Sequence, residues 1–141
     1  MVLSASSRPS PASNRLLAAL PPEDFARLQP DLEFTPLRLG WAVYESGDTQ
    51  GYVYFPTDAI VSLMYVLADG GSTELGVVGN DGVVGISLFM GGETTPSRAV
   101  VQSAGNGFKL RASILKAEFE RGGALRHLLL RYTQALITQM T

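Results

Sequence analysis

The chain has 141 residues, of which 45% are hydrophobic and 17% charged, and this composition is typical of one folded domain. It contains no cysteine and a single histidine, His127, which excludes disulfides, thiolate metal sites and metal sites built from several histidines. Every apolar run is far shorter than the roughly 20 residues that span a bilayer, so the sequence predicts no membrane helix. No secretory signal pattern is present either, and the expected location is the cytoplasm.

The net charge is −2, but the charges are unevenly distributed along the chain. Residues 1–108 carry five basic and eleven acidic side chains, whereas residues 109–141 carry six basic and two acidic ones. A cationic surface on C-terminal helices accounts for this balance. It is too weakly basic to predict DNA binding by this part of the chain alone.

Two short helices are predicted near the N-terminus. Residues 1–13 are rich in serine and proline and have no apolar period, which predicts a flexible arm. Asn14 is the predicted N-cap of a helix over residues 14–20. The pair Pro21 and Pro22 ends that helix, and Pro22 begins a second helix that stops before Pro30.

The middle of the chain predicts roughly seven or eight short strands, because aromatic and β-branched residues alternate with turn-forming ones. The clearest of these strands cover residues 32–39, 41–44, 52–55, 60–67, 73–78, 98–103 and 108–110. Residues 69–72 close a predicted hairpin, residues 80–82 form a sharp turn, and residues 105–107 link the last two strands. This pattern is typical of a β-sandwich, barrel or jelly roll.

The apolar spacing becomes helical again after the strands. Ser113 is the predicted cap of a helix that ends at Gly122 and Gly123. A last helix follows over residues 124–141, and it contains no residue that would end it. We therefore expect the natural sequence to continue beyond Thr141.

Four segments, NRLLAAL (14–20), YFPTDAIVSL (54–63), GNDGVVG (79–85) and FERGGALR (119–126), carry a resemblance to a known family. In this order they resemble the sensor domain of the cyclic-AMP receptor/FNR (Crp/Fnr) family of bacterial transcription regulators. The resemblance covers about residues 14–141 and implies a mainly β fold, a double-stranded β-helix (jelly roll) with flanking helices. It implies a sensor over residues 14–123 and a dimerisation helix over residues 124–141. The family's DNA-binding helix-turn-helix domain is absent from these 141 residues.

The resemblance also implies where a ligand would bind. The candidate pocket consists of Val84, Gly85, Ile86, Ser87, Leu88, Ser97, Arg98 and Ala99. In the family, a Gly-Glu pair holds the ribose, and the Arg of an Arg-Ser/Thr-Ala triplet neutralises the cyclic phosphate. Here Ile86 stands at the Glu position and Ser97 at the Arg position, while Arg98 is displaced by one residue and so faces the other side of its strand. We therefore expect a degenerate cassette, with no cofactor and with an effector that the sequence does not name.

The final helix carries an apolar stripe at helical spacing, formed by Leu125, Leu129, Tyr132, Leu136 and Met140. We expect that one β-roll does not cover this stripe along its full length. The stripe therefore predicts a homodimer in which the helix pairs with that of a second copy.

Two other functions stay open at this point. A working cyclic-nucleotide site would use Arg98 together with the backbone N–H groups that follow Gly85. An enzyme on a jelly-roll scaffold, such as a metal-dependent cupin, would need several histidine ligands. Because the chain has one histidine, the sequence favours a sensor over an enzyme.

Overall fold

The computed structural model describes residues 10–44, 51–85 and 97–140, and within them four α-helices and seven strands. Short 3₁₀ turns at Pro11–Ser13 and Gln29–Asp31 flank the first two helices. In chain order the elements are α1 (Arg15–Ala18), α2 (Pro22–Leu28), β1 (Glu33–Leu37), β2 (Ala42–Tyr44), β3 (Tyr52–Pro56), β4 (Ile60–Val66), β5 (Ser72–Val78), β6 (Ser97–Ser103), β7 (Gly105–Arg111), α3 (Ala112–Glu120) and α4 (Ala124–Met140).

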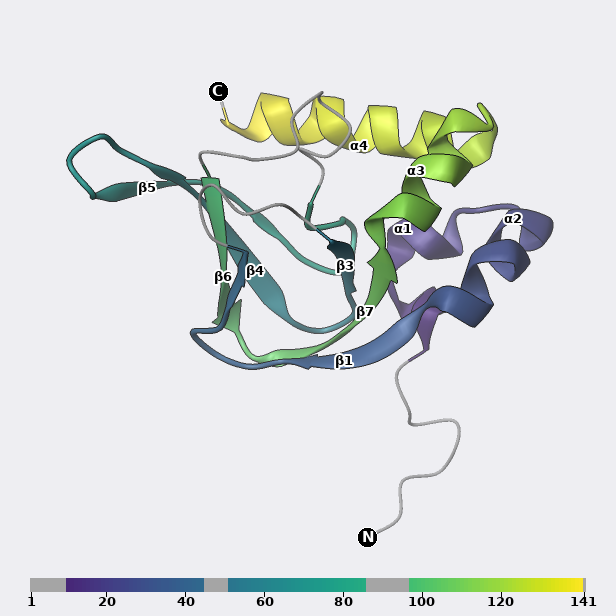
Figure 1. The fold of residues 1–141 in the computed structure, drawn as a ribbon, viewed down its shortest axis with the longest axis horizontal. Helices are drawn as coiled ribbons and strands as arrows, with labels where there is room; N and C mark the ends of the chain where they lie inside the picture. The colour runs from purple at the N-terminus through teal and green to yellow at the C-terminus, as the bar shows by residue number, and fades with distance from the viewer. Residues whose placement is uncertain (1–9, 45–50, 86–96, 141) are drawn as a thin grey trace, which may run out of the picture.

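The strands form two antiparallel sheets, ordered β1-β7-β3 and β2-β6-β4-β5. Figure 1 shows α1, α2 and α3 gathered at one end of these sheets, while the β4–β5 hairpin projects from the other end. Pro36 lies in β1, which is an edge strand, as expected for a residue that has no N–H to donate. The predicted jelly-roll class is confirmed, and the predicted hairpin joins β4 to β5.

The core divides into two clusters of buried apolar side chains. The helix-side cluster lies where the helices cover β3 and β7, and the roll-side cluster lies among the strands of the roll. Tyr54 packs against the roll-side cluster, while Val53 and Phe55 belong to the helix-side cluster, so alternation along β3 separates the two. The helix-side cluster is Leu16, Leu17, Leu20, Leu28, Val53, Phe55, Val83, Leu110, Leu115, Leu125 and Leu129. The roll-side cluster is Leu37, Ala59, Val61, Leu63, Val78, Val84, Ala99, Val101 and Leu136.

Asn14 is a fully buried polar residue that connects three segments of the chain. Its side-chain oxygen accepts a hydrogen bond from the Leu17 N–H at 3.1 Å, which is the predicted N-cap of α1. Its amide nitrogen donates to the carbonyl oxygens of Pro56 and Gly82, at 2.8 and 2.9 Å. The one side chain therefore ties α1 to the end of β3 and to the turn after β5.

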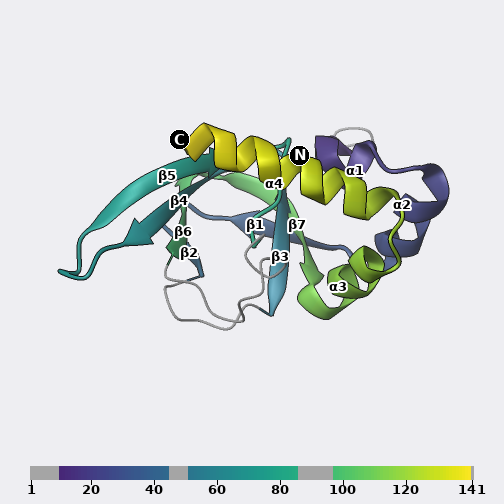
Figure 2. The same cartoon turned by 90° about the horizontal axis from the view of Figure 1, so that it is seen from above.

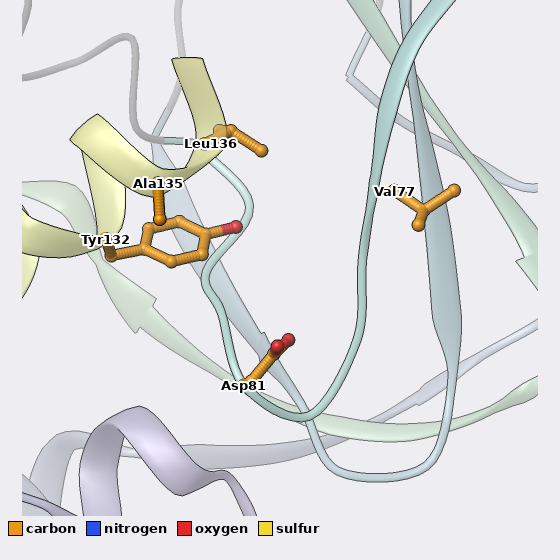
Figure 3. A pocket seen from close by; sticks show the side chains of 5 residues that line it. All are labelled: Val77, Asp81, Tyr132, Ala135 and Leu136. Atoms are coloured by element: carbon orange, nitrogen blue, oxygen red, sulfur yellow. The ribbon is translucent and has the colours of Figure 1, made fainter. Parts of the chain in front are cut away.

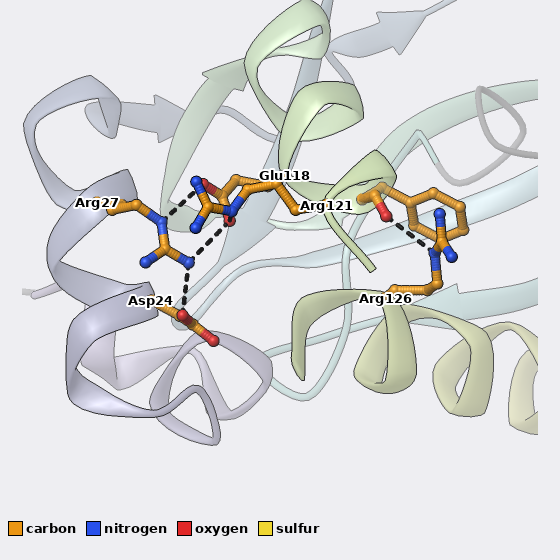
Figure 4. A network of polar contacts seen from close by, with 6 residues as sticks. Asp24, Arg27, Glu118, Arg121 and Arg126 are labelled. Carbon is orange, nitrogen blue, oxygen red and sulfur yellow. Dashed lines mark hydrogen bonds and ion pairs between the residues drawn. The ribbon is translucent and has the colours of Figure 1, made fainter. Parts of the chain in front are cut away.

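An ion-pair network joins α2 to α3 on the surface. Arg27 Nε lies 3.0 Å from Glu118 Oε1, and Arg27 Nη2 lies 2.5 Å from Asp24 Oδ1 (Figure 4). Hydrogen bonds to Glu118 and to Asp24 raise the pKa of Arg27 above its ordinary value. Nearby, Arg126 Nε in α4 donates a hydrogen bond to the Phe119 carbonyl oxygen in α3 at 2.9 Å and thereby connects the two helices.

Two local predictions were wrong. Residues 105–107 do not link strands but form the first part of β7, opposite residues 35–37 of β1. These glycines are needed for close backbone approach: a Cβ on Gly105 would lie 2.6 Å from the Ala59 nitrogen, and one on Gly107 would lie 2.8 Å from the Phe55 oxygen. Ser113 is not a cap, because α3 begins at Ala112, directly after β7, and no side chain caps it.

We expect Asn14→Ala to lower the free energy of unfolding by roughly 2–4 kcal/mol, because it removes the N-cap and leaves two buried carbonyls without a donor. Urea denaturation followed by far-ultraviolet circular dichroism measures this loss. Ser13→Ala, one residue away and exposed, is the control and should change the unfolding free energy by less than about 0.5 kcal/mol. Equal effects of the two variants would contradict the role given to the buried amide.

Candidate ligand site and the final helix

Residues 79–85 lead from β5 into the predicted ligand segment. The Gly82 N–H donates to the Gly79 carbonyl at 3.2 Å, which closes the predicted turn. Val84 then exchanges two backbone hydrogen bonds with Tyr54, at 2.8 and 3.0 Å. Gly85 is buried and has φ +114°, a conformation that favours glycine. Ile86, Ser87 and Leu88, and with them the backbone N–H groups that follow Gly85, lie outside the described residues.

The second half of the predicted cassette lies at the start of β6. Ser97, Arg98 and Ala99 pair with Tyr65, Met64 and Leu63 of β4, respectively. Ala99 is fully buried in the roll-side cluster. Because neighbouring residues of a strand point to opposite faces, this register places half-buried Arg98 on the face away from that cluster.

The structure brings Val84 and Ala99 together in the roll-side cluster, beside aromatic residues that the sequence analysis did not single out. Tyr44 pairs with Ala99 across the β2–β6 ladder, and Tyr54 packs against the same cluster. Trp41 contacts Tyr54 edge-on, with ring centroids 5.8 Å apart. The period of two in β3 was a usable signal, because it puts Tyr54 on the opposite face from its buried neighbours.

Three leucines of the apolar stripe of α4 are covered by the chain itself, whereas we expected that one β-roll does not cover this stripe along its full length. Leu125, Leu129 and Leu136 are only 2%, 1% and 5% exposed. The physical reason is that α4 runs lengthwise from α1 and α2 to β4 and β5, and so lies over both clusters (Figures 1 and 2). These three leucines are therefore unavailable to a partner, and the side chain of Met140 lies outside the described residues.

The outward face of α4 is mostly polar. His127, Arg131 and Gln134 are exposed. Leu130 lies among them with 53% of its surface exposed. It is the large apolar side chain that α4 presents to solvent within the described part of the chain.

Tyr132 occupies the junction between α4, β5 and the turn at residues 79–82. It lines a notch of about 140 Å³ together with Val77, Asp81, Ala135 and Leu136 (Figure 3). Its hydroxyl oxygen accepts a hydrogen bond from the backbone N–H of Val83. Burial outweighs this hydrogen bond and raises the pKa of Tyr132 to about 12.

The described residues contain neither a membrane-spanning helix nor a cluster of metal-ligating side chains. None of their helices is long and apolar enough to span a membrane. Acidic and histidine side chains nowhere gather in threes in the arrangement that would hold a metal ion.

Comparison with known proteins gives similarity in structure rather than in sequence: no family model and no curated protein sequence matches the chain. The N-terminal domain of a transcriptional regulator from Streptomyces coelicolor A3(2) is similar with a TM-score of 0.62 and 24% identity, over 89% of this chain and 88% of that one. The sensor domain of the transcriptional regulator DNR from Pseudomonas aeruginosa is similar with a TM-score of 0.67 and 18% identity, over 91% of this chain and 84% of that one.

The chain has the fold of Crp/Fnr-type sensor domains. A third similar structure is the c-di-GMP responsive global regulator CLP of Xanthomonas campestris, with a TM-score of 0.71 and 17% identity over 84% of this chain. The chain spans 60% of CLP. The three proteins named here are transcriptional or global regulators.

We expect a pH-dependent contribution of Tyr132 to stability between about pH 10 and 12. In this window the phenol ionises in the unfolded chain and stays neutral in the folded one, so the free energy of unfolding falls as pH rises, by roughly 2–3 kcal/mol in total. Urea midpoints on both sides of the window measure the fall. This decrease in the free energy of unfolding should be smaller in Tyr132→Phe and unchanged in Tyr65→Phe, because Tyr65 is 42% exposed. If Tyr132→Phe loses as much stability over this pH range as the parent chain, Tyr132 is not the group responsible.

Proposed function

We propose that this chain is the sensor and dimerisation domain of a Crp/Fnr-type transcription regulator, and that its cyclic-nucleotide cassette is degenerate. The observation that carries the proposal is the fold, which regulator sensor domains share over about nine-tenths of this chain. In such a regulator, DNA binding would belong to a further domain. The domain described here would receive a signal and pass it on through α4.

The chemistry of the described residues supports a degenerate cassette. A cyclic phosphate needs a cation in a partly dehydrated pocket, and the β6 register turns Arg98 away from Ala99 and the roll-side cluster. The position that the resemblance assigns to a ribose-binding carboxylate is occupied by Ile86. What faces the roll side is apolar or aromatic: Val84, Ala99 and Tyr54. An effector that suits these residues is a small apolar or aromatic molecule.

We expect no calorimetric heat of binding from cyclic AMP or cyclic GMP at about 100 μM. Loss of the carboxylate and the inward guanidinium removes about 3–6 kcal/mol of charge-assisted hydrogen bonding, a factor of about 10² to 10⁴ in affinity. Arg98→Ala is the matched variant, and it should leave the titration unchanged. Tight binding that Arg98→Ala abolishes would instead establish the alternative, a working cyclic-nucleotide domain that uses Arg98 and backbone N–H groups.

The homodimer is proposed to use the outward face of α4. Leu129 and Leu136 are already buried in their own chain, whereas Leu130 is exposed and is flanked by the polar residues Arg131 and Gln134. In a pair of helices that meet on this face, Leu130 would be buried between them and the polar residues around it would lie at the edge of the contact. Pairing on this face would leave both core clusters of each chain intact.

We expect sedimentation equilibrium at about 100 μM to show a dimer that Leu130→Asp converts to a folded monomer, because the substitution places two carboxylates at the helix contact. Leu67→Asp is the matched control, since Leu67 is also exposed, at 41%, but lies just beyond β4. It should leave the dimer intact. A monomeric parent chain, or dissociation by the control as well, would overturn the proposed interface.

A further inference from the structure

The turn at residues 79–82 is held from one side by α1. Asn14 Nδ2 donates to the Gly82 carbonyl at 2.9 Å, and the Arg15 N–H donates to the Asn80 carbonyl at 2.6 Å. Asn14 is itself fully buried and bonded to Pro56 at the end of β3. The turn is therefore fixed to the base of the β-roll.

Tyr132 of α4 holds the same turn from the other side. The Val83 N–H donates to the Tyr132 hydroxyl, and the phenol ring lies against the backbone of Gly82. A Cβ added at Gly82 would lie 2.6 Å from Tyr132 Cζ and 2.7 Å from Cε1, closer than such atoms approach in proteins. Any side chain at position 82 would therefore require the Tyr132 ring to shift.

The held backbone continues directly to the candidate ligand site. Val84 is locked to Tyr54 by two hydrogen bonds, and the buried Gly85 follows. On the other side of the contact, Tyr132 and Leu136 are inward residues of the second half of α4, and Tyr132 packs against both core clusters. Figure 3 shows the two residues on the same side of the helix, above the turn that carries Asp81.

We propose that Tyr132 is a positioning residue that couples α4 to the backbone leading to Gly85. A displacement of the turn at residues 79–82 would then move α4, and a displacement of α4 would move the turn. This coupling would carry a signal only if the proposed sensor function holds. The coupling itself, however, is a property of the single chain without a ligand. It is reciprocal, as coupling between two parts of a molecule must be.

Amide hydrogen exchange of Gly82→Ala, measured by nuclear magnetic resonance in dilute monomeric samples, tests the coupling. In the parent chain the substitution should speed exchange of the α4 amides of residues 130–136 by about tenfold or more. In a Tyr132→Leu background, where the shorter side chain leaves space for the Cβ, the same substitution should change these rates less than about threefold. Gly79→Ala is the matched control, because only Asp81 Oδ1, at 4.0 Å, lies near its Cβ position.

The coupling is refuted if Gly82→Ala leaves the α4 amides unchanged, or speeds them equally in both backgrounds. If Gly82→Ala does not fold, Tyr132→Phe replaces it, because that change removes only the hydroxyl. The amide of Val83 and those of residues 130–136 should then exchange faster together, whereas Tyr52→Phe, on β3, should affect neither. Unchanged exchange at Val83 refutes the proposal. A chain that neither dimerises nor binds an effector would defeat the proposed function and leave this result standing.

Discussion

A single buried amide, that of Asn14, sets the positions of the elements around it. A buried amide must satisfy its donors and its acceptor, and here all three bonds go to backbone groups that are distant from one another in the sequence. The start of α1, the end of β3 and the turn after β5 are thus held at hydrogen-bond distance from one side chain. Tyr132 packs on the turn that results, so the placement of α4 also depends on this amide.

The same arrangement decides what α4 can offer to a second copy. Each leucine that α4 buries stabilises its own chain by about 1.5–3 kcal/mol, and three of them are almost completely buried there. Exposing them to a partner would forfeit that burial, which is why the dimer proposed above uses the opposite face of α4. The helix would then be a rigid element between a folded core and a partner, and its angle would depend on its inward contacts.

Much of this fold could be predicted from local patterns, because caps, prolines and alternation act within a few residues. Asn14 as a cap, Pro22 at the start of α2 and the alternation in β3 all belong to this class. The glycines at 105 and 107 were misassigned because the backbone that crowds them comes from residues 55–59, some fifty positions away. The stripe of α4 was misassigned for a related reason: helical spacing shows that one face is covered, but not whether the cover is the same chain or another.

Prediction of the candidate site was limited in the same way, because some of its contacts join residues that are far apart in the sequence. The family resemblance placed Val84 and Ala99 in one cassette, and the structure packs both in the roll-side cluster. Alternation along β3 put Tyr54 on the face opposite its buried neighbours, but the pairing of Tyr54 with Val84 and of Tyr44 with Ala99 joins segments that no local pattern connects. Burial there raises the pKa of Tyr54, because desolvation disfavours the charged phenolate. An anion placed beside these residues would lose its hydration without gaining a cation from the roll-side face of β6. The proposed degenerate cassette would therefore disfavour phosphate through the cost of desolvation, whereas a neutral ring would meet no such cost.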